Sequence, residues 1–178
     1  MIRRWILACV LGEGTALGVL AVLGMLVSRL APEGGWALVV LMPVLGFVEG
    51  AIVGGFQAKA TGAVGAPKRW VLATGTGLSL AWLGGGLLSF FEPSAPPTLA
   101  LMLGGSAIGG AVVGALVGLF QAQANPTLDR LPWMFWNALA WSSGLLVSAL
   151  LSQLIWGPFS FAVFALELLQ GVSVGLVV

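Results

Sequence analysis

Long apolar runs are the feature that most constrains the fold of this 178-residue chain. Charged or turn-rich segments separate the runs, and each run has about 19 to 24 residues, enough to cross a bilayer as a helix. Hydrophobic residues make up 59% of the chain, charged residues only 7%, and the mean hydropathy is +1.07. We therefore expect an integral membrane protein. The predicted spans are residues 6–28, 35–58, 70–91, 99–122, 133–155 and 159–178.

The basic residues predict how the chain is oriented. If the N-terminus is cytoplasmic, six of the seven Lys and Arg residues fall in cytoplasmic segments, and only Arg29 falls outside. Basic loops stay on the cytoplasmic side of a membrane. We therefore predict a multi-pass protein of the cell inner membrane, with both the N- and the C-terminus in the cytoplasm.

Two segments of the chain are nearly identical. The sequence GAIVGGFQAKA begins at Gly50, and GALVGLFQAQA begins at Gly114, an offset of 114 − 50 = 64 residues. The odd-numbered spans also begin alike, with Trp5, Trp70 and Trp133 at matching positions. The pattern predicts an all-α bundle of six transmembrane helices, built as one domain (residues 1–178) from three tandem parallel α-hairpin repeats. The repeats cover about residues 1–60, 66–124 and 130–178.

Glycines recur every four residues in the even-numbered spans. Residues at this spacing lie on one face of a helix, where small side chains let a neighbouring helix approach closely. We interpret these glycines as helix-packing residues. They are Gly46, Gly50 and Gly54 in the second span, Gly110, Gly114 and Gly118 in the fourth, and Gly171 and Gly175 in the sixth. Gln57 and Gln121 end the first two rows, where we expect their amides to bond a helix end or water.

Three glutamates, Glu13, Glu49 and Glu167, lie inside predicted spans, where an unpaired charge costs several kcal/mol. Glu13 follows Trp5 by eight residues, and Glu49 precedes Gln57 by eight residues. Eight residues of helix rise ~12 Å, so both glutamates are predicted to lie at one depth, where they can meet.

Two interpretations of these glutamates stay open. In the first, they form a site for a proton, an ion or a small solute. The residues of that predicted site are Glu13, Glu49, Glu167 and Gln170, the last of which aligns with Glu49. In the second, each glutamate is protonated and joins helices through a hydrogen bond. The proposed partners are a facing backbone carbonyl, Thr15, Thr74, Asn137 or Ser142. Carboxylates without an E-x-x-H pair do not match the di-iron pattern, so we predict no metal site.

The eight tryptophans fall into two groups. Those near span ends are predicted to lie in the headgroup region of the membrane, as an aromatic belt. They are Trp5, Trp36, Trp70, Trp133 and Trp156. The deeper ones either pack or line a site for an apolar, planar ligand such as a pigment or a quinone. They are Trp82, Trp136 and Trp141.

Several function classes are disfavoured. The chain has no histidine, and it contains no nucleophile elbow, phosphate-binding loop or dinucleotide fingerprint, so we do not expect an enzyme. A net charge of +1 without clustered basic residues argues against a nucleic-acid partner. No residue pattern identifies a cofactor.

One segment resembles a known group of proteins. The run G-x-x-x-G-x-x-Q, followed by a basic loop and by R-W-V-L-A-T-x-x-G, extends from Gly50 to Gly77. It is similar to small, uncharacterised bacterial membrane proteins that are common in cyanobacteria and other phototrophs, and the likeness covers most of the chain. In that group a tryptophan and a Leu-Arg-Arg end usually follow the glutamine, whereas Ala58 and Lys59 follow Gln57 here. The resemblance implies a polytopic membrane protein and assigns no functional residue.

Two functions fit these observations. The chain is either a non-catalytic helix-packing component, docked in the bilayer with other transmembrane subunits or with a second copy, or a component for transport of a small solute, an ion or a proton. The glycine rows favour the first function. The intramembrane glutamates favour the second.

Overall fold

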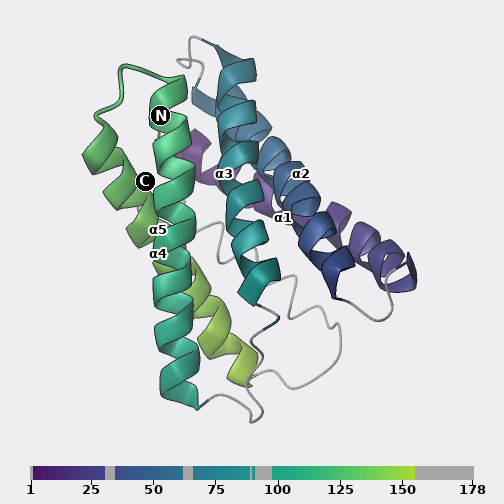
Figure 1. Ribbon diagram of the computed structural model, residues 1–178. Coiled ribbons are helices and arrows are strands. Elements are labelled where there is room, and N and C mark those ends of the chain that lie inside the picture. The colour runs from purple at the N-terminus through teal and green to yellow at the C-terminus, as the bar shows by residue number, and fades with distance from the viewer. Residues whose placement is uncertain (1, 31–34, 62–65, 89, 91–97, 155–178) are drawn as a thin grey trace.

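The computed structural model describes residues 2–30, 35–61, 66–88, 90 and 98–154 of the chain (Figure 1). Five α-helices make up this part of the chain, which contains no strand, so the prediction of an all-α fold is confirmed. The helices are α1 (Ile2–Leu30), α2 (Trp36–Thr61), α3 (Pro67–Leu88), α4 (Leu99–Ala124) and α5 (Arg130–Leu154). The predicted sixth span, residues 159–178, lies outside the described residues.

Four of these helices are long and apolar enough to cross a membrane. Their candidate spans are Arg3–Val27, Val39–Ala60, Pro67–Leu88 and Leu99–Ala124. The prediction of a membrane-embedded helical protein is confirmed to this extent. Helix α5 has 25 residues and carries Asn137, Ser142, Ser143 and Ser148.

The helices form a bundle in which consecutive helices are neighbours (Figure 1). The most extensive contacts join α2 to α3 and α4 to α5, while α1 packs on α2 and α3 packs on α4. Side chains of four different helices meet in one core cluster. The cluster consists of Cys9, Leu78, Val117, Ala140 and Trp141. Many large apolar side chains of the same helices remain exposed on the outside, as expected of helices surrounded by lipid.

Glycines set the distance between the two closest helix pairs. A Cβ atom added to Gly50 of α2 would lie 2.5 Å from the carbonyl oxygen of Thr74 in α3. A Cβ atom on Gly114 of α4 would overlap the carbonyl group of Asn137 in α5. Because the obstructing atoms belong to the backbone, they cannot rotate away, and only glycine permits this approach. The other glycines of the two rows, Gly46, Gly54, Gly110 and Gly118, also face α3 or α5. Gly171 and Gly175 lie outside the described residues.

A second kind of contact joins α1 to α2 and α3 to α4. A Cβ atom on Gly12 of α1 would lie 3.1 Å from the Cα atom of Val53 in α2. A Cβ atom on Gly77 of α3 would lie 2.8 Å from the Cα atom of Val117 in α4. The two contacts use residues 77 − 12 = 65 and 117 − 53 = 64 positions apart. Two kinds of interface therefore alternate along the described helices.

Candidate functional site

The structure buries both glutamates that it describes within helices. Glu13 on α1 is 3% exposed, and Glu49 on α2 is 8% exposed. Burial of two carboxyl groups in a helical bundle is costly, so their positions need an explanation other than solvent contact. Glu167 and Gln170, the other members of the predicted site, lie outside the described residues.

A hydrogen-bonded layer of side chains closes one end of the bundle. The oxygen Gln57 Oε1 accepts bonds from Trp70 Nε1 at 3.2 Å and from Gln121 Nε2 at 3.1 Å. Gln121 Nε2 also donates to Thr74 Oγ1 at 3.0 Å, and Gln121 Oε1 accepts from Trp133 Nε1 at 3.1 Å. Four helices, α2 to α5, are thereby linked through side chains. We call Trp5, Gln57, Trp70, Gln121 and Trp133 the Trp–Gln layer.

Three indole rings of the Trp–Gln layer surround one another. The ring centroids of Trp5 and Trp70 are 6.5 Å apart, those of Trp5 and Trp133 are 6.3 Å apart, and those of Trp70 and Trp133 are 6.1 Å apart. These distances and the steep angles between the rings fit favourable edge contacts between aromatic side chains. Helix α1 joins the layer through Trp5 and through Cys9, whose sulfur accepts a bond of 3.7 Å from Gln57 Nε2.

The Trp–Gln layer differs from the sequence prediction. Trp70 is 2% exposed, so its assignment to a lipid-facing belt is wrong. Its indole N–H finds a glutamine acceptor inside the protein, which removes the need for the headgroup region. Gln57 bonds Trp70 in the first turn of α3 and Gln121 in the last turn of α4, so its amide reaches the ends of neighbouring helices, as predicted. Trp36, at 73% exposed, does have the exposure expected of a belt residue.

The layer also fixes the depth of the glutamates. Trp5 and Gln57 both contact Trp70, so they lie at one level of the bundle. Helix α1 runs away from this level, and helix α2 runs toward it. Glu13 and Glu49 are each eight residues from the layer, which corresponds to ~12 Å along a helix. Both carboxyl groups therefore lie at a similar depth beyond the layer.

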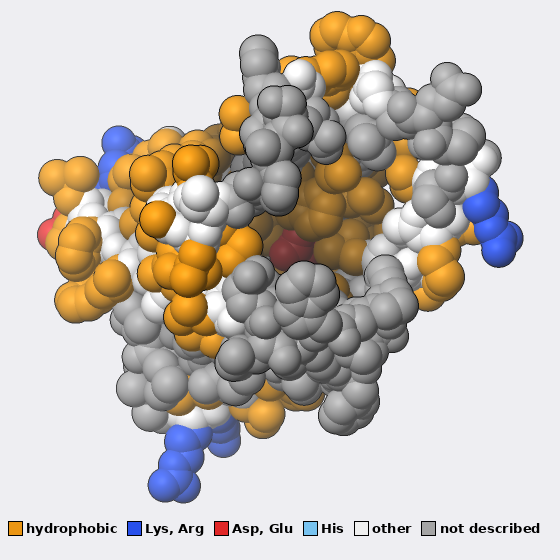
Figure 2. Space-filling model, turned by 90° about the horizontal axis from the view of Figure 1, so that it is seen from below, with side chains coloured by type: hydrophobic (Ala, Val, Ile, Leu, Met, Phe, Trp, Pro, Cys, Tyr) orange, Lys and Arg blue, Asp and Glu red, His pale blue; other side chains and the backbone are white. Residues whose placement is uncertain are grey.

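The bundle is hollowed at the end opposite the Trp–Gln layer. Figure 2 views the molecule from this end and shows an acidic side chain deep in a hollow, and the described side chains around it are mainly hydrophobic. The acidic residues within described helices are Glu13 and Glu49, while Asp129 is exposed in the connection between α4 and α5. The hollow therefore combines apolar walls with a buried carboxyl group.

The side chains expected to hold the glutamates are bonded elsewhere. The hydroxyl of Thr74 donates to the Trp70 carbonyl at 3.0 Å, and that of Ser142 donates to the Ala107 carbonyl at 2.8 Å. Asn137 Nδ2 donates to the Trp133 carbonyl at 2.9 Å. Thr15 is exposed on α1. The three donors of Thr74, Asn137 and Ser142 therefore bind backbone carbonyls one helical turn away or on a facing helix, and the partners of the glutamates stay a prediction.

The deeper tryptophans have different surroundings. Trp141 lies in the core cluster, Trp82 lies against Gly46, and Trp136 contacts Phe135 and is half exposed. Among the described residues there is no group of three or more His, Cys, Asp or Glu side chains able to hold a metal ion.

No family model, curated protein or solved structure matches this chain. The function is therefore argued from the geometry of the site.

Proposed function

We propose that this protein binds a small, positively charged solute with an apolar body, and that Glu13 and Glu49 receive the charge. The observation that carries the proposal is the hollow, which has hydrophobic walls and an acidic side chain deep inside it (Figure 2). A carboxylate in an apolar environment is costly, and a cation beside it offsets much of that cost. Apolar walls add contact with the rest of the ligand, as in most small-molecule sites.

The two ends of the bundle support a role in solute capture or transport. The Trp–Gln layer joins the helices at one end through hydrogen bonds and ring contacts. The hollow opens at the other end, which we assign to the non-cytoplasmic side because Lys59, Lys68 and Arg69 lie at the end with the layer. A solute entering from the open end reaches the glutamates before it meets the layer. For the solute to cross the membrane, the side chains of the Trp–Gln layer must then move apart.

We further propose that six helices, in three repeated hairpins, complete the bundle. The contacts of α2 with α3 recur in α4 with α5, at residues 64 positions apart such as Gly50 and Gly114. If this glycine contact recurs a third time, the predicted sixth span packs on α1 through Gly171 and Gly175. The buried Nε1 of Trp5, which has no hydrogen-bond partner among the described residues, lies where the other two layer indoles have acceptors.

This plan brings a third acidic residue to the site. Gly46 of α2 lies against the carbonyl of Leu78, and Gly110 of α4 lies against that of Trp141. In the sequence repeat, Glu167 corresponds to these two glycines, and Glu13 corresponds to Leu78 and Trp141. The sixth span therefore places Glu167 next to Glu13. An added acidic group strengthens the attraction for a cation.

Labelling of single cysteines tests the hollow and the six-helix plan together. In a Cys9→Ser background, which keeps an acceptor for Gln57, we expect Glu49→Cys to react with a membrane-impermeant cationic methanethiosulfonate from the non-cytoplasmic side. Lys59→Cys is expected to react from the opposite side only. Ala140→Cys, at a fully buried position, is the control and should stay unlabelled.

Six spans also require that Arg3→Cys and Val178→Cys react from the same side as Lys59→Cys. Failure of residue 49 to react in folded protein, or reaction from the side of Lys59, contradicts the open hollow. Reaction of residues 3 and 178 from opposite sides contradicts the six-helix plan, independently of how the cysteine at position 49 is labelled.

A second candidate function, docking with a transmembrane helix of another subunit, is favoured by one face of α4. Leu101, Ile108 and Val112 are exposed on this face, and added Cβ atoms on Gly105 and Gly109 would meet no atom within 4 Å. Small residues beside exposed apolar ones are typical of helix contacts in membranes. This function needs neither the hollow nor the glutamates, so Glu13→Gln and Glu49→Gln would leave it intact.

A further inference from the structure

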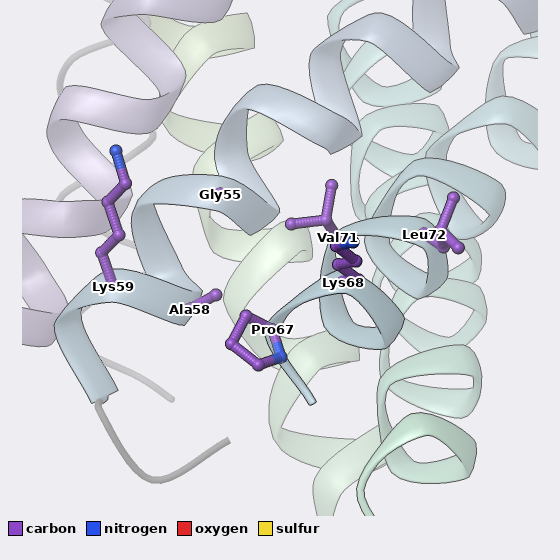
Figure 3. A pocket seen from close by; sticks show the side chains of 7 residues that line it. All are labelled: Gly55, Ala58, Lys59, Pro67, Lys68, Val71 and Leu72. Carbon is purple, nitrogen blue, oxygen red and sulfur yellow. The ribbon is translucent and has the colours of Figure 1, made fainter. Parts of the chain in front are cut away.

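A separate pocket of about 500 Å³ lies between the end of α2 and the start of α3 (Figure 3). Its apolar lining consists of Gly55, Ala58, Pro67, Val71 and Leu72. An added Cβ atom on Gly55 would meet no atom within 4 Å, so this part of the floor is open. The pocket lies beside the Trp–Gln layer end of the bundle, far from the hollow that contains the glutamates.

Two lysines complete the lining of this pocket. Lys59 extends from the last turns of α2, and Lys68 lies in the first turn of α3 (Figure 3). Both are exposed, as is the neighbouring Arg69. No acidic side chain is among the lining residues, and the described acidic residues belong to the bundle interior or to the α4–α5 connection. The pocket is therefore apolar inside and positively charged at its rim.

The position of the pocket relative to the membrane identifies the class of ligand. One candidate span ends at Ala60, and the next begins at Pro67, so the pocket lies where apolar helix meets the headgroup region. Lysines at this level attract anionic headgroups, and each contributes to binding. The apolar floor faces the depth at which acyl chains begin. A ligand that fits both parts has a negatively charged head and a hydrocarbon tail.

We propose that this pocket binds an anionic phospholipid of the cytoplasmic leaflet. The headgroup phosphate lies between Lys59 and Lys68, and the first part of one acyl chain lies over Gly55 and Val71. Lysine side chains suit this role because their stems pack on apolar surface while the ammonium groups reach the headgroups. The bound lipid bridges α2 and α3 at the end where the Trp–Gln layer joins them.

Native mass spectrometry of the purified protein tests this proposal, with phosphatidylglycerol and phosphatidylcholine added in equal amounts. We expect the wild type to retain one phosphatidylglycerol in preference to phosphatidylcholine. Lys59→Gln with Lys68→Gln should lower that preference about tenfold, because each lysine near the headgroup contributes to the attraction. Gly55→Leu, which fills the floor but keeps both charges, should lower retention of phosphatidylglycerol. Arg130→Gln removes one positive charge outside the pocket and is the matched control.

The proposal is overturned if the wild type retains both lipids equally. It is also overturned if Arg130→Gln lowers the preference as much as the lysine variant does, or if Gly55→Leu retains phosphatidylglycerol like the wild type. Competition by free glycerol phosphate alone, without a requirement for acyl chains, would show that the pocket binds only the phosphate and would likewise contradict it. Folding of each variant is checked by its elution volume and tryptophan emission, so loss of the pocket is distinguished from loss of the fold.

Discussion

Gly114→Ala is expected to lower the free energy of unfolding by about 2 to 3 kcal/mol, because the new methyl group has no space. A Cβ atom at this position overlaps the carbonyl group of Asn137, and it also lies 2.7 Å from the Cα atom of Ala138. Both obstacles are backbone atoms of α5, so the two helices must move apart. Separation also weakens contacts at Gly110 and Gly118 on the same face. Denaturant titration in detergent, followed by circular dichroism, measures the change.

The matched control for this substitution is Gly109→Ala. Gly109 lies on the same helix, five residues away, and a Cβ atom there meets nothing within 4 Å. We expect a change within about 0.5 kcal/mol, as for substitutions outside packed contacts. If Gly114→Ala is as stable as Gly109→Ala, the close approach of α4 and α5 is not how the helices pack in the protein.

Gln121→Leu is expected to lower the free energy of unfolding by about 2 kcal/mol, because it leaves a partly buried donor, Trp133 Nε1, without an acceptor. Gln121 accepts from Trp133 Nε1 and donates to Gln57 Oε1 and Thr74 Oγ1. Leucine has a similar size, so the main loss is hydrogen bonding and not volume. Gln57 keeps the bond from Trp70, so Trp133 loses the most.

Gln123→Leu is the control for this substitution, because it makes α4 less polar without removing the hydrogen bonds of Gln121. Gln123 is two residues along the same helix and is exposed. We expect near-wild-type stability for Gln123→Leu, and a shift of tryptophan emission only for Gln121→Leu, since only that change disturbs the indoles of the Trp–Gln layer. Equal stability and equal emission of the two variants would show that the layer does not hold the helices together.

The helices themselves were predictable because their apolar runs are long and their ends are marked by charged or turn residues. The glycine rows were predictable as faces, since four-residue spacing defines a face whatever it packs against. The helix that lies opposite each row was not predictable: Gly50 of α2 contacts α3, and Gly114 of α4 contacts α5. Choice of a neighbour depends on the whole bundle and has no local signal.

The Trp–Gln layer shows a different limit. Trp70 and Gln57 lie near span ends, where tryptophan and glutamine are also stable at the membrane surface. Only the tertiary structure brings an indole donor to a glutamine acceptor from another helix. The matching sequence positions of Trp5, Trp70 and Trp133, and of Gln57 and Gln121, were the available signal, because equivalent residues of a parallel repeat would lie at one level. That signal indicated the level and not the direction of the side chains.

Burial of Glu13 and Glu49 agrees with their placement inside apolar runs. The bonds of Thr74, Asn137 and Ser142 were not predictable, because these side chains find backbone acceptors on their own or a facing helix. Competition of this kind is common for short polar side chains in helices.

Binding of tetraphenylphosphonium tests the central claim most directly. We expect the wild-type protein in lipid nanodiscs to bind this cation saturably and to bind neutral triphenylphosphine oxide much less. Glu13→Gln with Glu49→Gln should weaken binding of the cation at least about tenfold, which corresponds to 1.4 kcal/mol, while the fold and the Trp–Gln layer stay intact. Equal affinity of the wild type and the double variant, or no saturable binding by folded wild type, would contradict a cation site at these glutamates.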